Sequence, residues 1–106
     1  MTDERLEEVV MGLVGFAGEG RSYAFEALRF ARKGDFDASD EAMKKCAEAL
    51  LEAHHVQTDL IQGEIQGEPT KITLLMVHAQ DHLMTAMLAK DFVEELIADK
   101  KELAKK

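Results

Sequence analysis

A chain of 106 residues is long enough for a single domain with one hydrophobic core. Its 46% hydrophobic and 32% charged residues are ordinary for a soluble globular protein, and no apolar run is long enough to cross a bilayer. The net charge of −8 argues against nucleic acid as a partner, because the phosphates would be repelled.

The first predicted element is a helix from Asp3 to Arg32, along which apolar residues recur at helical spacing. Four glycines lie inside it, and each lowers helix stability by about 1 kcal/mol relative to alanine. A kink or break near Gly18–Gly20 is therefore one expectation. No strand precedes these glycines and no Gly-Lys-Ser/Thr follows them, so close helix packing is a better interpretation than a phosphate-binding loop.

The second predicted helix runs from Phe36 to Gln62, after a stop-and-start signal in which Gly34 ends one helix and Asp35 caps the next. Cys46 lies on its apolar stripe, which predicts a small buried hydrophobe. A single cysteine cannot form an intrachain disulfide, and no signal peptide is evident, so we expect a cytoplasmic protein without membrane insertion.

The third predicted helix runs from Thr70 to Lys101, with Pro69 in its first turn. The segment before it, residues 63–69, is the only linker. Three helices with short connections predict an all-α fold, an antiparallel three-helix bundle that forms one domain over residues 1–106.

The third helix has two apolar faces. Residues 72–89 contain twelve apolar side chains out of eighteen, without glycine or proline. At about 100° per residue they form two stripes on opposite sides, and a helix with two apolar faces must be covered twice. One face can pack on its own domain, and the simplest cover for the other is a second copy of the same helix. The first stripe comprises Ile72, Met76, Ala79, Leu83 and Met87, and the second Leu74, Val77, Met84 and Leu88.

Three ionisable residues interrupt this apolar segment. Asp81 falls in the middle of the second stripe, while His78 and His82 lie one turn apart on its flank. Burial of ionisable groups is unfavourable, so their presence indicates a use. Taken alone, the pattern also fits core histidines with satisfied hydrogen bonds.

The polar residues of the second helix are less informative. His54 and His55 point about 100° apart and cannot readily share a metal, and Gln57 on the apolar stripe is expected to bond another helix. Residues 1–70 carry the whole net charge of −8, and residues 71–106 are neutral. This asymmetry suits a basic protein partner, although acidity that merely maintains solubility explains it equally well.

Three segments together resemble the enzyme IIA component of the lactose/cellobiose (and chitobiose) class of the bacterial sugar phosphotransferase system. Residues 6–13 (LEEVVMGL) resemble the opening helix of that family, residues 51–61 (LEAHHVQTDLI) its second-helix signature, and residues 77–84 (VHAQDHLM) its active-site motif. The likeness covers nearly the whole chain and is least diagnostic beyond Asp99.

The resemblance implies a cytoplasmic homotrimer in which the third helices form a parallel seam. It implies that His78 receives a phosphoryl group from the phosphocarrier HPr and passes it to a cysteine of the cognate IIB domain. Gln80 and His82 match side chains that line the phosphorylation site. Asp81 matches an aspartate that meets its symmetry mates around an axial divalent metal, which we expect to be Mg²⁺. The sugar, of lactose, cellobiose or chitobiose type, is not specified.

Two other classes remain as alternatives. A two-component histidine phosphotransfer domain is also a small helical bundle, but it typically has Lys and Gly soon after its histidine, where this chain has Gln80, Asp81 and His82. A metal-stapled structural trimer without transfer activity is the second alternative. A IIB identity is disfavoured, because Cys46 lies within a predicted helix and not on a phosphate-binding loop.

Overall fold

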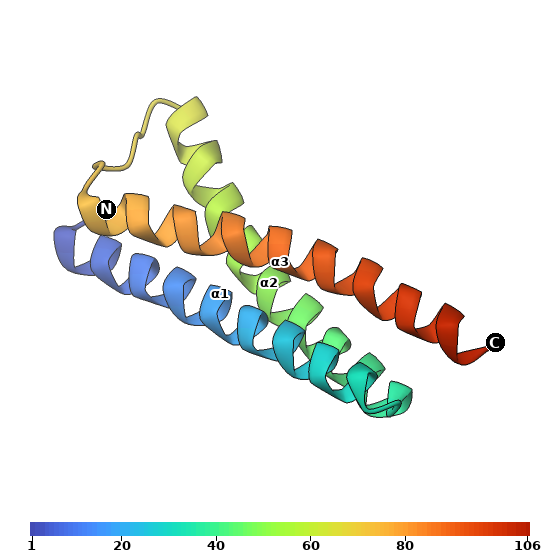
Figure 1. Ribbon diagram of the computed structural model, residues 1–106. Coiled ribbons are helices and arrows are strands. Elements are labelled where there is room, and N and C mark those ends of the chain that lie inside the picture. The colour runs from blue at the N-terminus through green and yellow to red at the C-terminus, as the bar shows by residue number, and fades with distance from the viewer.

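The computed structural model describes all 106 residues as three helices without strands. Helices α1 (Asp3–Arg32), α2 (Phe36–Ile65) and α3 (Leu74–Ala104) run in alternating directions in an elongated bundle of 56 × 22 × 19 Å (Figure 1). The predicted all-α, antiparallel three-helix fold is therefore confirmed, and the bounds of the first helix are those expected.

Helix α1 is continuous through its glycines, so the break considered near Gly18–Gly20 does not occur. Gly20 is buried, and a Cβ atom there would lie 2.5 Å from Cδ2 of Leu50 on α2. A Cβ atom at Gly18 would meet nothing within 4 Å. Of the four glycines of α1, only Gly20 is therefore needed for close helix packing.

The turn between α1 and α2 is the one that its sequence predicts. Gly34 has φ +83°, the left-handed conformation that glycine adopts without strain, and the amide of Asp35 donates to the carbonyl of Phe30. The carboxylate of Asp35 then accepts from the amide of Ala38 at 3.2 Å and caps α2.

Helix α2 continues past the predicted end at Gln62 and stops at Ile65. Gly63 stays helical, and Gly67 takes the left-handed conformation with φ +89°. The amide of Glu68 donates to the carbonyl of Gly63 at 2.8 Å, which closes the helix end. The linker therefore begins later than the predicted residue 63.

Helix α3 was expected over residues 70–101, but it begins at Leu74 and ends at Ala104. Pro69 lies in the linker. The hydroxyl of Thr73 accepts from the backbone amide three residues further on at 3.1 Å, and this cap sets the start of the helix. The later start puts the histidine motif in the second turn of α3.

Helix α1 packs against both other helices, whereas α2 and α3 contact each other much less. Figure 1 shows why: the second half of α2 tilts away from the other two helices. The last buried residue of α2 is Ala53. The first apolar stripe of α3 contributes Met76, Ala79 and Leu83 to the core, but Ile72 is exposed because it precedes the helix.

Candidate functional site

The second apolar stripe of α3 is left uncovered by the rest of the chain. Its members are 52–86% exposed although all are large and apolar, and they lie opposite the buried side of the helix. They are Leu74, Val77, Met84 and Leu88, and Phe92 extends the stripe by one turn. An exposed apolar face of this length is typical of an interaction surface.

Asp81 lies in the middle of this stripe, as predicted, and is exposed. Its carboxylate makes no ion pair and no side-chain hydrogen bond within the chain. No group of three or more histidine, cysteine, aspartate or glutamate side chains is arranged to hold a metal ion in the protomer. One copy of the chain therefore supplies a single carboxylate to any metal at this position.

His78 and His82 form a pair on one flank of the stripe. Their ring centroids are 4.6 Å apart and the ring planes are inclined by 76°, an edge-to-face arrangement. His78 is exposed, whereas His82 is half-buried. The hydroxyl of Thr85 donates to the carbonyl of Asp81 at 2.8 Å, so it does not compete for either imidazole. The imidazole of His78, the more exposed of the two rings, is accessible to another protein.

Gln80 lies on the other flank of α3, about 200° around the helix from His78. It is half-buried and faces α2, where Nε2 of Gln57 donates to its Oε1 at 2.7 Å. Within one protomer, Gln80 and His78 therefore do not share a site. Gln57 bonds another helix, as its position on the stripe of α2 predicted, but the sequence did not indicate which residue it would meet.

The remaining polar candidates of α2 do not join the site. His54 and His55 are both exposed, and His54 borders a shallow groove with Leu51 and Met87. Cys46 is fully buried, and burial raises the pKa of its thiol. A buried thiol with a raised pKa is a packing residue and a poor nucleophile.

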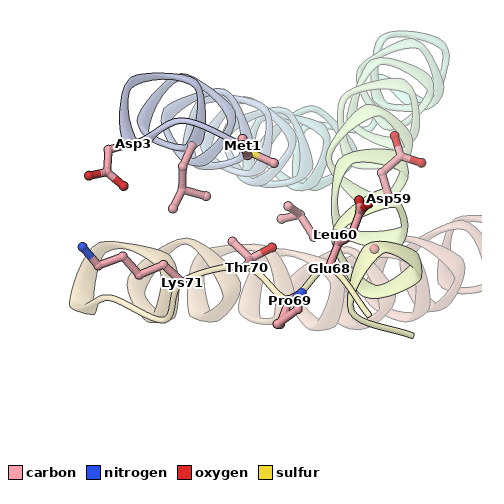
Figure 2. A pocket seen from close by; sticks show the side chains of 10 residues that line it. Met1, Asp3, Asp59, Leu60, Glu68, Pro69, Thr70 and Lys71 are labelled. Carbon is pink, nitrogen blue, oxygen red and sulfur yellow. The ribbon is translucent and has the colours of Figure 1, made fainter. Parts of the chain in front are cut away.

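A cavity at one end of the bundle lies away from the histidines. Figure 2 shows it between the start of α1, the end of α2 and the linker. It has a volume of about 570 Å³ and is lined by Asp3, Asp59, Glu68 and Lys71 among others. Neither histidine of the pair borders it, so this cavity and the histidine pair are separate features of the chain.

One buried polar residue was missed by the sequence analysis. Ser39 is fully buried, and its hydroxyl donates to the carbonyl of Ala27 at 2.9 Å. Little in the sequence indicated that Ser39 is buried, because a serine in the first turn of a helix is equally typical of the capping region. This bond ties the start of α2 to α1 and is structural.

These features define a class: a small all-α protein with an exposed histidine beside an uncovered apolar helix face. Comparison with known proteins agrees. Residues 8–101 match the family described as "PTS system, Lactose/Cellobiose specific IIA subunit". The chain belongs to this IIA family of the phosphotransferase system, as its resemblance predicted.

Three relatives illustrate the match. The N,N'-diacetylchitobiose-specific EIIA component of Escherichia coli K12 is 52% identical over 94 residues, which are 89% of this chain and 81% of the relative. The cellobiose-specific enzyme IIA from Bacillus anthracis superposes with a TM-score of 0.92 at 47% identity, covering 100% of this chain and 95% of that one. The IIA component in the IIA(Chitobiose)–HPr complex of E. coli superposes with a TM-score of 0.81 at 48% identity, covering 93% and 96%.

No helix of the chain is both long enough and apolar enough to span a membrane. The family match over residues 8–101 includes the segment that carries His78, Gln80, Asp81 and His82.

Proposed function

We propose that this protein is the cytoplasmic phosphocarrier of a sugar phosphotransferase branch, which accepts a phosphoryl group from HPr on His78 and passes it to a cysteine of a cognate IIB domain. The observation that carries the proposal is the exposed His78 paired with His82 on the flank of α3. Membership of the IIA family and the HPr complex of the E. coli relative support it.

The chemistry suits a neutral imidazole. One ring nitrogen of His78 attacks phosphorus with its lone pair, the new N–P bond forms, and the bond from phosphorus to the donor atom of HPr breaks, leaving its electron pair on HPr. The other ring nitrogen keeps its proton. In the second transfer a thiolate of IIB attacks, a P–S bond forms, the N–P bond breaks, and His78 recovers its lone pair.

His82 is the proposed hydrogen-bond donor to the transferred group. Its ring is held by partial burial and by edge-to-face contact with His78, one turn away. Phosphoryl transfer depends mainly on positioning and charge stabilisation, which an oriented N–H can supply. The reactive groups are thus imidazoles on a surface, and no sugar site is needed on this chain.

The uncovered stripe supports a homotrimer whose α3 helices form a parallel seam. Its large apolar residues are mostly exposed in one copy, and a seam would bury them. In such a seam each helix turns its two flanks toward two different neighbours. The flank of one copy that carries His78 would then adjoin the flank of the next copy that carries Gln80, so Gln80 would line the site across the subunit boundary.

Asp81 fits an axial divalent cation only in that assembly. Three carboxylates meeting on an axis would repel one another, and a hard ion such as Mg²⁺ with oxygen ligands would relieve the repulsion. One protomer offers a single carboxylate without an internal partner. The three copies of Asp81 would hold the ion, which would stabilise the seam and take no part in the transfer.

The sugar is proposed only by class, a disaccharide of the lactose, cellobiose or chitobiose type. Relatives named for N,N'-diacetylchitobiose and for cellobiose are similar to this chain to comparable degrees, 52% and 47% identical. Because the IIA component hands phosphate to another protein, its surface does not have to discriminate between sugars.

Reconstitution with phosphoenolpyruvate, enzyme I, HPr and IIB tests the function. The protein should acquire label from ³²P-phosphoenolpyruvate only when HPr is present, and lose it when IIB is added. A histidine phosphotransfer domain would take label from a histidine kinase or response regulator and not from HPr. A purely structural trimer would take no label from HPr, from a histidine kinase or from a response regulator. Labelling by a kinase or regulator in place of HPr, or no labelling at all, would refute the proposed function.

A further inference from the structure

Gln57 on α2 and Gln80 on α3 join the two helices through a hydrogen bond between their side-chain amides. Nε2 of Gln57 donates to Oε1 of Gln80 at 2.7 Å, and both side chains are half-buried. Gln57 lies in the second half of α2, the half that tilts away from the bundle (Figure 1). The amide pair is therefore a polar link between α3 and the tilted half of α2.

The bond determines which end of the Gln80 amide is free. Oε1 of Gln80 is occupied as an acceptor, so the group left over is its NH₂, which has two donors. The nearest acceptor to that NH₂ is Sδ of Met76 at 3.6 Å, and thioether sulfur is a weak acceptor. The NH₂ of Gln80 therefore has no strong acceptor within the protomer, whereas its carbonyl oxygen is already bonded to Gln57.

We propose that Gln57 is a positioning residue for phosphoryl transfer: by donating to Oε1 of Gln80 it keeps the NH₂ of Gln80 turned toward the phosphoryl group on His78 of the neighbouring copy. This inference rests on the proposed function and on the parallel seam. Phosphoryl oxygens only accept hydrogen bonds, so an N–H stabilises them and a carbonyl oxygen in its place repels them.

The second donor contact of Gln57 is too weak to change this assignment. Its Nε2 also lies 3.7 Å from Sδ of Met84, a sulfur contact that leaves the shorter bond to Gln80 dominant. A glutamine amide can turn by about 180° around its last side-chain bond, because that torsion is roughly two-fold. Without a fixed partner, Gln80 would present oxygen and nitrogen about equally.

The test replaces the side-chain amide nitrogen of Gln57 by an oxygen atom. Gln57→Glu keeps the size and shape of the side chain, but a carboxylate can only accept, so the NH₂ of Gln80 should turn inward and its oxygen outward. Gln62→Glu is the matched control, because it makes the same change on an exposed position of the same helix. Gln57→Met removes both the donor and the strong acceptor and fills the half-buried position with an apolar side chain of similar length.

We expect the turnover of phosphoryl transfer from HPr to fall roughly ten- to a hundred-fold in Gln57→Glu, the range for one hydrogen bond to a charged group, with the KM for phospho-HPr little changed. The turnover of Gln57→Met should lie between those of Gln57→Glu and the wild type, and the turnover of Gln62→Glu should equal that of the wild type. Circular dichroism and sedimentation should be unchanged in all three.

A double-mutant cycle separates positioning from general damage. In a Gln80→Met background, Gln57→Glu should cause no further loss, because Gln57 acts only through Gln80. Equal losses in both backgrounds, or a wild-type rate in Gln57→Glu, would overturn the inference while leaving the proposed function intact. A wild-type protein that takes no label from HPr would overturn the proposed function, and this inference with it.

Discussion

His78 and His82 stand edge to face on α3, with ring centroids 4.6 Å apart, and they differ in exposure. His82 is half-buried and held by its surroundings, whereas His78 is exposed to a partner. The pair therefore contains one positioned ring and one accessible ring. This asymmetry supports the proposed roles, in which His78 is the nucleophile and His82 the hydrogen-bond donor.

His82→Ala should slow phosphorylation by HPr roughly tenfold without abolishing it, because one donor to the phosphoryl group is lost and the nucleophile remains. The measurement is the rate of ³²P incorporation at fixed HPr. His54→Ala, an exposed histidine on α2, is the control and should retain the wild-type rate. Complete loss of labelling by a folded His82→Ala would instead make His82 the acceptor.

The oligomeric state tests the exposed stripe of α3. Met84 lies on the stripe and Met11 on the outer side of α1, and both are 52% exposed in the protomer. Met84→Lys should dissociate the assembly, since it puts a charge into the seam, whereas Met11→Lys should not. Sedimentation of the wild type should give about three times 11.8 kDa. A wild-type monomer at micromolar concentration contradicts the seam.

Asp81 should make the stability of the protein depend on metal. A chelator should lower the melting temperature of the wild type at neutral pH, because three converging carboxylates would lose their counter-ion. Asp81→Leu should remove this sensitivity and give an equally or more stable trimer, since replacing buried charge by a packed hydrophobe is often neutral or stabilising. Thermal melts of both proteins, with and without chelator and Mg²⁺, measure the effect.

The contrary outcome for Asp81 is equally clear. If neither chelator nor Mg²⁺ shifts the melt of the wild type, and Asp81→Leu dissociates the trimer, then Asp81 is a structural hydrogen-bonding residue and no axial ion is present.

Cys46 should be inert in the folded protein. Burial raises the pKa of its thiol, so the folded state favours the protonated form. That contribution to stability is present below the ordinary thiol pKa and is lost as pH rises through the raised value in the folded state. At pH 8, alkylation by iodoacetamide should be at least about tenfold slower in native buffer than in urea. Equal rates would show that the bundle opens around Cys46.

Local sequence signals predicted most of the fold, and they failed where two signals competed. The turn at Gly34 and Asp35 was predicted correctly, because a glycine that ends one helix is followed directly by an aspartate that caps the next. The end of α2 was wrong because Gly63 stays helical and the left-handed turn that ends the helix is made at Gly67. The start of α3 was wrong because the cap at Thr73 prevails over the helix-start preference of a proline.

The site was predictable only in part for a related reason. The side of α3 on which His78, Asp81 and His82 lie follows from helical periodicity, and each lies where the helical wheel puts it. The partner of Gln57 did not follow, because the meeting of two side chains from different helices depends on the crossing angle. Sequence periodicity within one helix carries no information about that angle.

The most direct test of the central claim is the position of the phosphoryl group after reaction with HPr. In a mixture of phosphoenolpyruvate, enzyme I and HPr, the wild type should take up one phosphoryl group per chain. His78→Ala should take up none while keeping wild-type helicity and sedimentation, since an exposed side chain is removed. His55→Ala, an exposed histidine on α2, should be labelled normally. Labelling of His78→Ala at the wild-type level would contradict the account.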